Sequence, residues 1–305
     1  MKTKSLILLS LVVTMAGHMF AQPTNPLPTF PTKPWTAIVK VIGENGQPVG
    51  SANVVVGYIL PPYSFSDDTN YNANISGFTD TNGIFFATHN DRTGEVGFSV
   101  NKQGYYDTHS LRTLRDPMDN ANDRDISLTM VLKKMGKPIA MYAKRINSLK
   151  VPEFNKAIGY DLMIGDWVGP YGKGINADLF FTEKHTGPHS GYILSVSFPN
   201  SGDGIQEFTV PDTEKGSALR SSREAPVDGY QPELAQTETT NPNRNFYFRV
   251  RTKLDENGNV VSTRYGKIYG DLAQFTYYFN PTPNDQDVEF DTKQNLLGGE
   301  QVSEP

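Results

Sequence analysis

The stretch WTAIVKVIGENGQPVGSANVVV, residues 35–56, decides how this chain begins to fold. From Trp35 to Val41 the residues alternate between two faces, which predicts a strand. One face holds Trp35, Ala37, Val39 and Val41, and the other holds Thr36, Ile38 and Lys40. Asn45-Gly46 tolerates positive φ angles and predicts a tight turn. Pro48 cannot donate a hydrogen bond inside a sheet, so we expect it just before the next strand, Ala52 to Val56. The stretch therefore predicts two strands joined by a turn.

The next turn signal is Asp80-Thr81-Asn82-Gly83, which leads into the apolar residues Ile84 to Phe86. Asp80 and Asn82 offer oxygens two residues apart, as a calcium loop does, but no further acids and no closing Glu follow. We therefore predict a tight turn. The residues before it, from Pro61 to Gly77, are rich in Asn, Asp and Ser and predict a long surface loop.

Two more strands are predicted, from Val96 to Val100 and from Ile126 to Leu132, and Lys102-Gln103-Gly104-Tyr105-Tyr106 lies between them. The order of these parts resembles the carboxypeptidase regulatory-like domain, a small transthyretin-like β-sandwich found in many secreted bacterial proteins. The resemblance covers residues 36–132, and the loop at 61–77 is an insertion in it. It implies a structural or adhesive accessory domain, and no metallocarboxypeptidase catalytic domain accompanies it.

The second half predicts another β-domain, which begins after Lys133-Lys134-Met135. No segment keeps a sustained helical period, because Pro152 interrupts the candidate from Leu149 to Ile158. Asn257-Gly258 predicts a hairpin. This half resembles only uncharacterised exported bacterial proteins. We expect its strands at 139–145, 160–164, 179–182, 192–198, 246–251, 260–268 and 275–279.

The chain is therefore predicted to be all-β, with a small transthyretin-like β-sandwich at 35–135 and a larger β-sandwich or jelly-roll-like domain at 136–293. Residues 211–245 are polar and hold four prolines, which predicts a long loop inside the second domain. Residues 294–305 have little to bury and predict a flexible tail.

The first residues predict export. Lys2 and Lys4 precede an apolar run, Leu6 to Met15, that has the length of a signal-peptide core and is too short to cross a bilayer. We expect residues 1–21 to be a signal peptide cut before Gln22, although Met19 is larger than the residue that such a cleavage site favours. Residues 22–34 hold five prolines and predict a stiff linker.

Composition excludes several classes of function. The chain has no cysteine, which excludes disulfides, thiolate metal sites and a lipid anchor on cysteine. Loss of Lys2 and Lys4 with the signal leaves 26 Lys and Arg against 33 Asp and Glu, so the formal charge changes from −5 to −7. An acidic chain without a basic cluster is not expected to bind nucleic acid. No second apolar segment of spanning length follows, so we expect no membrane span after signal removal.

One segment stands out as a candidate binding site. Residues 165–174, GDWVGPYGKG, are dense in glycine and aromatic residues, but their spacing does not fit a phosphate-binding loop. Trp167 and Tyr171 form the candidate pair, because aromatic rings stack on the apolar faces of sugars. The alternative is that Trp167 packs at the end of the sandwich while the glycines make tight turns. We favour the packing role.

Other chemistry-bearing residues lack the pattern that catalysis or metal binding needs. Glu183, His185 and His189 have metal-ligand types, but Gly187-Pro188 breaks any helix there, and we favour exposed loop histidines over a zinc site. No Gly-x-Ser-x-Gly motif surrounds a serine, and Ser110 beside His109 is a neighbour in sequence alone. Acidic pairs such as Asp67-Asp68, or Glu289 with Asp291, are common in an acidic chain. We predict no catalytic residue, no metal ligand and no cofactor.

These observations predict a non-catalytic exported protein, periplasmic or secreted, that serves as a binding or cell-envelope structural module. Its expected partner is an extracellular carbohydrate or an envelope component. The alternative is an extracellular hydrolase of polysaccharide or peptide, with its site in the second domain.

Overall fold

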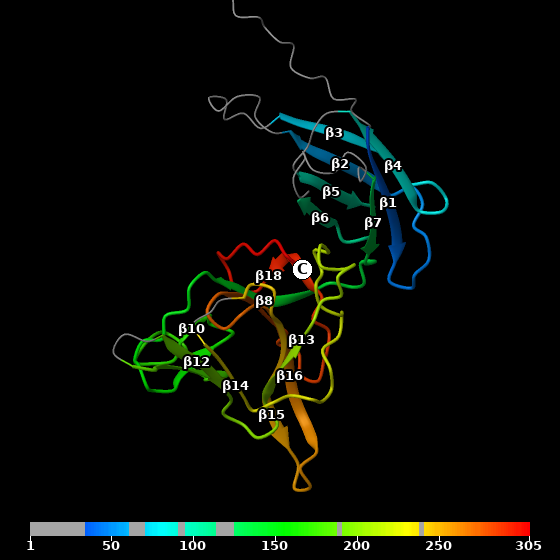
Figure 1. The fold of residues 1–305 in the computed structure, drawn as a ribbon. Helices are drawn as coiled ribbons and strands as arrows, with labels where there is room; N and C mark the ends of the chain where they lie inside the picture. The colour runs from blue at the N-terminus through cyan, green and yellow to red at the C-terminus, as the bar shows by residue number, and fades with distance from the viewer. Residues whose placement is uncertain (1–33, 61–70, 91–94, 114–124, 188–190, 238–240) are drawn as a thin grey trace, which may run out of the picture. The chain divides into compact units, whose positions relative to one another are not determined.

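The computed structural model of the chain describes residues 34–60, 71–90, 95–113, 125–187, 191–237 and 241–305. Every regular element in these residues is a β-strand, which confirms the predicted all-β class (Figure 1). Within the same ranges, no helix has the length and apolarity that crossing a membrane requires.

Two sheets form the N-terminal β-sandwich, in the strand orders β4-β1-β7 and β3-β2-β5-β6. β1 and β7 pair in parallel, and the other neighbours are antiparallel. Alternate residues of β1 point into the core, where Ala37, Val39 and Val41 are fully buried. The strands are β1 (Trp35–Gly43), β2 (Asn53–Leu60), β3 (Tyr71–Phe78), β4 (Ile84–His89), β5 (Glu95–Asn101), β6 (Thr108–Thr113) and β7 (Asp125–Leu132).

Both turns predicted in this sandwich are present. Gly46 has a φ of +74°, which glycine adopts without a Cβ clash, and its N–H donates to the Gly43 carbonyl at 2.9 Å. Asp80 Oδ1 accepts the N–H groups of Asn82 at 2.9 Å and Ile84 at 2.8 Å. The Asp80 carboxylate therefore stabilises the turn through its own backbone, as an Asx-turn does.

Strand β3 corrects the loop that was predicted from Pro61 to Gly77. Residues 71–78 pair antiparallel with β2, while 61–70 lie outside the described residues. Ala73 and Ile75 pack against the core, and Asn74 and Ser76, which alternate with them, are exposed. The loop was predicted because Asn, Asp and Ser are common in loops. In 71–78, however, the polar residues lie on the solvent face of a strand.

Two further sheets enclose a second core. Their strand orders are β10-β9-β11-β12-β14 and β13-β15-β16-β17-β8-β18. Phe181 of β11 and Phe246 and Phe248 of β15 belong to this core. The strands are β8 (Ile139–Ile146), β9 (Ile158–Asp161), β10 (Asp166–Trp167), β11 (Leu179–His185), β12 (Tyr192–Ser197), β13 (Gly204–Phe208), β14 (Glu233–Thr237), β15 (Asn245–Leu254), β16 (Val260–Gly270), β17 (Phe275–Phe279) and β18 (Phe290–Asn295).

The six-stranded sheet is buried on both faces. Phe246 and Phe248 point into the second core, whereas Tyr247 between them belongs to a third cluster with Tyr269 and Tyr278. This double burial explains why β17 is buried at all five of its positions. The alternation predicted for β15 is present, but its second face also meets protein.

Residues 211–232 contain no strand, as the predicted loop requires, but the segment 211–245 otherwise departs from that prediction. It contains β14, and it buries Leu219 fully and Ala225 to 2% exposure, the latter against the third cluster. The predicted tail at 294–305 places Val302, 2% exposed, in the same cluster. Isolated apolar residues in polar segments give no periodic signal, so the sequence offered no pattern from which to predict this packing. The flexibility of the tail stays a prediction.

Residues 33–305 form one compact unit, and several hydrogen bonds join the first half to the second. The Tyr106 hydroxyl donates to Glu289 at 2.7 Å. Both Nη atoms of Arg223 donate to the Glu44 carboxylate, at 2.9 and 2.8 Å. Lys133 pairs with Glu214 at 2.8 Å. The separate folding of residues 35–135 and 136–293 stays a prediction.

Candidate functional site

The glycine-rich loop at 165–174 is held at its base by one carboxylate. Asp161, the last residue of β9, is 2% exposed. Its Oδ1 accepts the N–H groups of Met163 and Ile164 at 3.0 and 3.2 Å. Its Oδ2 accepts those of Ile175 and Asn176, both at 3.0 Å. One side chain therefore joins the segments that lead into and out of the loop.

A second carboxylate joins residues within the loop. Asp166 Oδ1 accepts the N–H of Trp167, and Oδ2 accepts the N–H of Lys173, both at 2.8 Å. Close approach of the backbone explains the glycines, because a Cβ on Gly172 would lie 2.4 Å from the Trp167 carbonyl oxygen. A Cβ on Gly174 would lie 2.8 Å from the Asp166 carbonyl oxygen. The loop requires glycine at these two positions for space.

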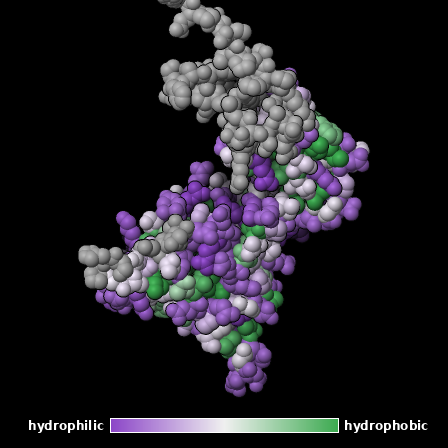
Figure 2. Space-filling view, in the orientation of Figure 1, coloured by the Kyte–Doolittle hydropathy of each residue, from purple (hydrophilic) through white to green (hydrophobic). Residues whose placement is uncertain are grey.

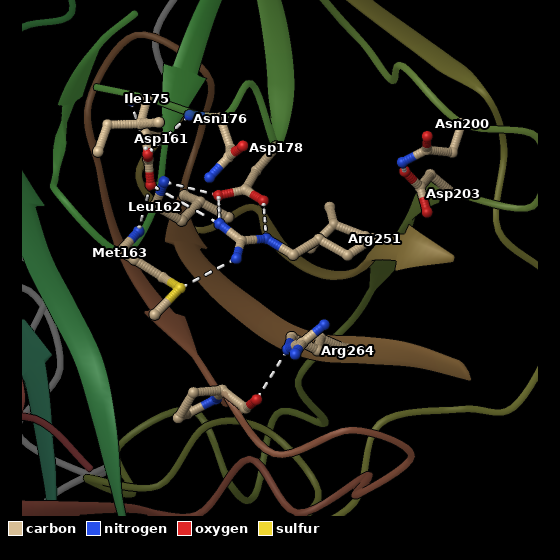
Figure 3. Close-up of polar contacts among 12 residues, drawn as sticks. Asp161, Leu162, Met163, Ile175, Asn176, Asp178, Asn200, Asp203, Arg251 and Arg264 are labelled. Carbon is tan, nitrogen blue, oxygen red and sulfur yellow. Dashed lines mark hydrogen bonds and ion pairs between the residues drawn. The ribbon is translucent and has the colours of Figure 1, made fainter. Parts of the chain in front are cut away.

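Beside the loop lies an ion pair between Asp178 and Arg251 (Figure 3). Arg251 donates from Nε to Asp178 Oδ1 at 2.5 Å and from Nη2 to Oδ2 at 3.0 Å. Asp178 Oδ2 also accepts the Leu162 N–H at 2.8 Å. Burial raises the pKa of Asp178 above its usual value, and the hydrogen bond from Arg251 opposes this shift. The same hydrogen bond raises the pKa of Arg251.

The backbone of β15 bends where it presents this arginine. Arg251 has a φ of +57°, and the pairing of β15 with β16 is irregular between Val250 and Lys253. A non-glycine residue in this region is uncommon and is stabilised by its surroundings. Here the fork of hydrogen bonds to Asp178 and a contact of Nη1 with Met163 Sδ at 3.0 Å fix the side chain. The ion pair thus ties β15 to the base of the glycine-rich loop.

Of the two residues predicted as a binding pair, Trp167 lies against the core. Its ring meets Tyr160 edge-on, with centroids 5.2 Å apart and planes at 89°. It meets Phe181 in the same manner, at 5.9 Å and 79°. These edge-to-face contacts are the favourable geometry for aromatic pairs. The side chain remains partly exposed, and its role stays a prediction.

Tyr171, the other predicted residue, joins a polar cluster that the sequence analysis missed. Its hydroxyl donates to Glu153 and accepts from Lys156 Nζ at 2.8 Å. The hydrogen bond from Tyr171, and then that from Lys156, lowers the pKa of Glu153. Contacts with Tyr171 and Glu153 raise the pKa of Lys156. Phe154, which lies between Glu153 and Lys156 in the sequence, is 54% exposed. Its ring meets that of His185 edge-on, with the ring centroids 4.4 Å apart.

The remaining candidates are separated or engaged elsewhere. His185 lies 3.7 Å from Glu183, and His189 lies outside the described residues, as do Asp67 and Asp68. No group of three or more His, Asp or Glu side chains is placed to hold a metal within the described ranges.

Glu289, from the other predicted acidic pair, is 1% exposed and accepts the N–H of Gly136 at 2.8 Å besides the Tyr106 hydroxyl. Asp291 is partly exposed and accepts the Lys293 N–H at 3.0 Å. In β6, the main-chain N–H of His109 donates to the Gly216 carbonyl at 2.9 Å. These residues form hydrogen bonds with the chain itself.

No family model and no curated protein matches the chain. Among solved structures, it is similar to 3-chlorocatechol 1,2-dioxygenase from Rhodococcus opacus, with 15% identity over 34% of this chain and 60% of that chain, and a TM-score of 0.26. Catechol 1,2-dioxygenase from Acinetobacter radioresistens gives 20% identity over 34% of this chain and 54% of that chain, with a TM-score of 0.25.

A shaft pilin from Lactobacillus rhamnosus GG gives 10% identity over 76% of this chain and 93% of that chain, with a TM-score of 0.25. Identities and TM-scores this low carry no argument about function. The resemblance of residues 36–132 to the carboxypeptidase regulatory-like domain is not confirmed by a family model and remains a proposal.

Proposed function

We propose that this chain is an exported, non-catalytic β-sandwich module that acts by binding a component outside the cell. The observation that carries the proposal is the use of the carboxylates around the glycine-rich loop. Asp161 accepts four backbone N–H groups with its two oxygens, and Asp166 accepts two more. Both oxygens of each carboxylate are thus engaged by the backbone of the loop and its flanking segments.

A carboxylate engaged in this way serves to hold a loop in one conformation. Loops that a rigid scaffold positions are common sites of recognition, because little entropy is lost when a partner binds. The signal-like residues 1–21 and the resemblance of residues 36–132 to an accessory domain of secreted proteins support the exported location.

The test compares binding with cleavage. Purified residues 22–305 are mixed with whole cell envelope and with insoluble polysaccharides, and both the retained protein and the released reducing ends or new amino groups are measured. We expect retention on at least one fraction without release of product. Steady release of product that scales with protein concentration would instead establish the hydrolase.

A further inference from the structure

We propose that Phe154, Tyr171, Glu153, Lys156 and His185 form a binding surface for the sugar rings of a neutral polysaccharide. This group is called the Phe154 surface below. The inference rests on the proposed binding function and names its ligand class and its place on the molecule.

The exposure of Phe154 is the first observation. In the second half, Phe181, Phe246, Phe248, Phe275, Phe279 and Phe290 are buried, whereas 54% of Phe154 is open to solvent. On the face drawn in Figure 2, hydrophobic residues form small patches separated by polar ones. A single open ring with polar neighbours suits a ligand that has both an apolar face and many hydroxyls.

The polar rim around the ring is the second observation. Phe86 and Phe78 are also exposed, at 62% and 69%, but the hydroxyl, carboxylate and amine that flank Phe154 are mutually hydrogen-bonded. Lys156 Nζ lies 3.1 Å from Glu153 Oε2, so the two charges compensate each other. A rim with balanced charge favours a neutral ligand over a polyanion, and its donors and acceptors match sugar hydroxyls.

The third observation is that the backbone under the surface is fixed. The Asn155 N–H donates to the Glu183 carbonyl of β11 at 2.8 Å, which attaches residues 153–156 to the five-stranded sheet. Tyr171 stands on the loop that Asp161 and Asp166 hold, and its N–H donates to the Val168 carbonyl at 3.2 Å. Phe154 is steadied by the His185 ring. A surface arranged before binding loses less entropy on binding.

In this surface Tyr171 is paired with Phe154, and not with Trp167 as the sequence suggested. The edge contacts of Trp167 with Tyr160 and Phe181 place its ring against the core. Trp167 therefore supports the loop from beneath. Tyr171 also packs partly against this core and has the Lys156 amine 5.3 Å above its ring centroid, so the ligand stacks on Phe154 and meets the exposed part of Tyr171.

The experiment is affinity gel electrophoresis of residues 22–305 in gels that contain a neutral β-glucan, xyloglucan, starch or, as the polyanion, alginate. Four variants are compared with the parent protein: Phe154→Ala, Tyr171→Ala, Trp167→Ala and Phe86→Ala. Phe86→Ala is the matched control, because Phe86, on β4, is a ring of similar exposure, 62% against 54%. The melting temperature of each variant is measured alongside its mobility.

We expect at least one neutral polysaccharide to retard the parent and Phe86→Ala equally. Phe154→Ala should bind at least tenfold more weakly with a melting temperature close to that of the parent. Tyr171→Ala should also bind more weakly, but with a lower melting temperature, because Tyr171 packs partly against the core. Trp167→Ala should lower the melting temperature. Equal retardation of Phe154→Ala and the parent would overturn the inference.

Failure of every neutral polysaccharide to retard the parent would also overturn it. The broader proposal of a binding module is judged separately, by retention on whole envelope, and survives if that retention persists. Retardation by alginate alone would show that charge, and not ring stacking, drives binding, which again contradicts the inference.

Discussion

Lys267 of β16 is a fully buried amine in a set of aromatic side chains. Its Nζ lies 3.1 Å from Ser221 Oγ, and 4.8 and 4.9 Å from the ring centroids of Tyr269 and Tyr278. Burial lowers its pKa well below the usual value of 10.5. Three nearby carboxylates raise the pKa of Lys267, and the amine of Lys133 lowers it. The carboxylates are those of Glu289, Asp287 and Glu304. The carboxylates favour the charged amine, but desolvation outweighs them.

We predict that Lys267→Met changes how stability depends on pH. Because the folded pKa lies below 10.5, the unfolded chain binds one more proton between the two pKa values, and stability rises with pH across that window. The slope from this group approaches about 1.4 kcal/mol per pH unit, and it vanishes above the unfolded pKa and below the folded one. Methionine fills the same space without a proton.

Urea unfolding at several pH values checks this prediction. As the pH rises towards the unfolded pKa, the parent should gain unfolding free energy relative to Lys267→Met. Lys253→Met, at an exposed lysine of β15, is the control and should run parallel to the parent. Parallel curves for Lys267→Met and the parent would show that the amine keeps its proton on folding.

Among the elements of the second sandwich, β15, β16 and β17 pack closely around Gly266. Gly266 of β16 pairs with Phe248 on one side and Phe279 on the other. A Cβ at Gly266 would lie 2.2 Å from Phe248 Cζ and 2.3 Å from the Tyr278 carbonyl oxygen. The backbone oxygen cannot move aside without breaking the sheet, so glycine is required by space.

We therefore expect Gly266→Ala to lower the unfolding free energy by about 3 kcal/mol, the upper part of the range for overpacked cores. Gly97→Ala in β5 is the matched control, because the nearest atom to its new Cβ would be the Gly57 oxygen at 3.9 Å. Gly97→Ala should change stability by less than about 1 kcal/mol. Chemical denaturation of both variants gives the comparison, and similar losses would mean that the sheet adjusts around Gly266.

The strands that the sequence predicted are those with a local signal. Phe275 to Phe279 was predicted with the bounds that β17 has, and Tyr192 to Phe198 nearly so, since β12 ends at Ser197. The strands β6, β10, β13, β14 and β18 were missed. β18 pairs in parallel with β8, far away in sequence, so that neither its partner nor its register leaves a local pattern. Alternation identifies a strand but does not show which strand it joins.

The candidate site was also predictable only where the sequence carries a local signal. The aromatic and glycine content of residues 165–174 identified the loop and Tyr171. The sequence did not identify the rest of the cluster, which is Glu153, Phe154 and Lys156. These residues lie in another segment, from Leu149 to Ile158, where the pattern indicated at most a short helix interrupted by Pro152. In the structure this segment has no helix and reaches Tyr171 through side chains alone. A spatial neighbour of this kind requires the fold.

At the scale of the whole molecule, the two halves have separate hydrophobic cores joined by polar contacts. Among the residues that the structure describes, those in the core of the N-terminal sandwich all lie between 35 and 132. Residues of the second half contact its edges, since the Ala218 N–H donates to the Asp107 carbonyl at 2.9 Å and the Val131 N–H donates to the Thr213 carbonyl at 3.3 Å. These bonds cover the edge strands β6 and β7, which would otherwise be open.

We predict that residues 35–135 alone fold into a soluble β-domain with one cooperative unfolding transition, because their core is complete without the second half. The fragment should be less stable than the same residues in the full chain, since it loses the pairing at β6 and the Glu44–Arg223 contact. Circular dichroism with urea unfolding of the fragment, residues 136–305 and the full chain gives the measurement. An unfolded fragment would show that the halves depend on each other to fold. A folded fragment that dimerises would indicate that the exposed edge of β6 pairs with a second copy, as uncovered edge strands do.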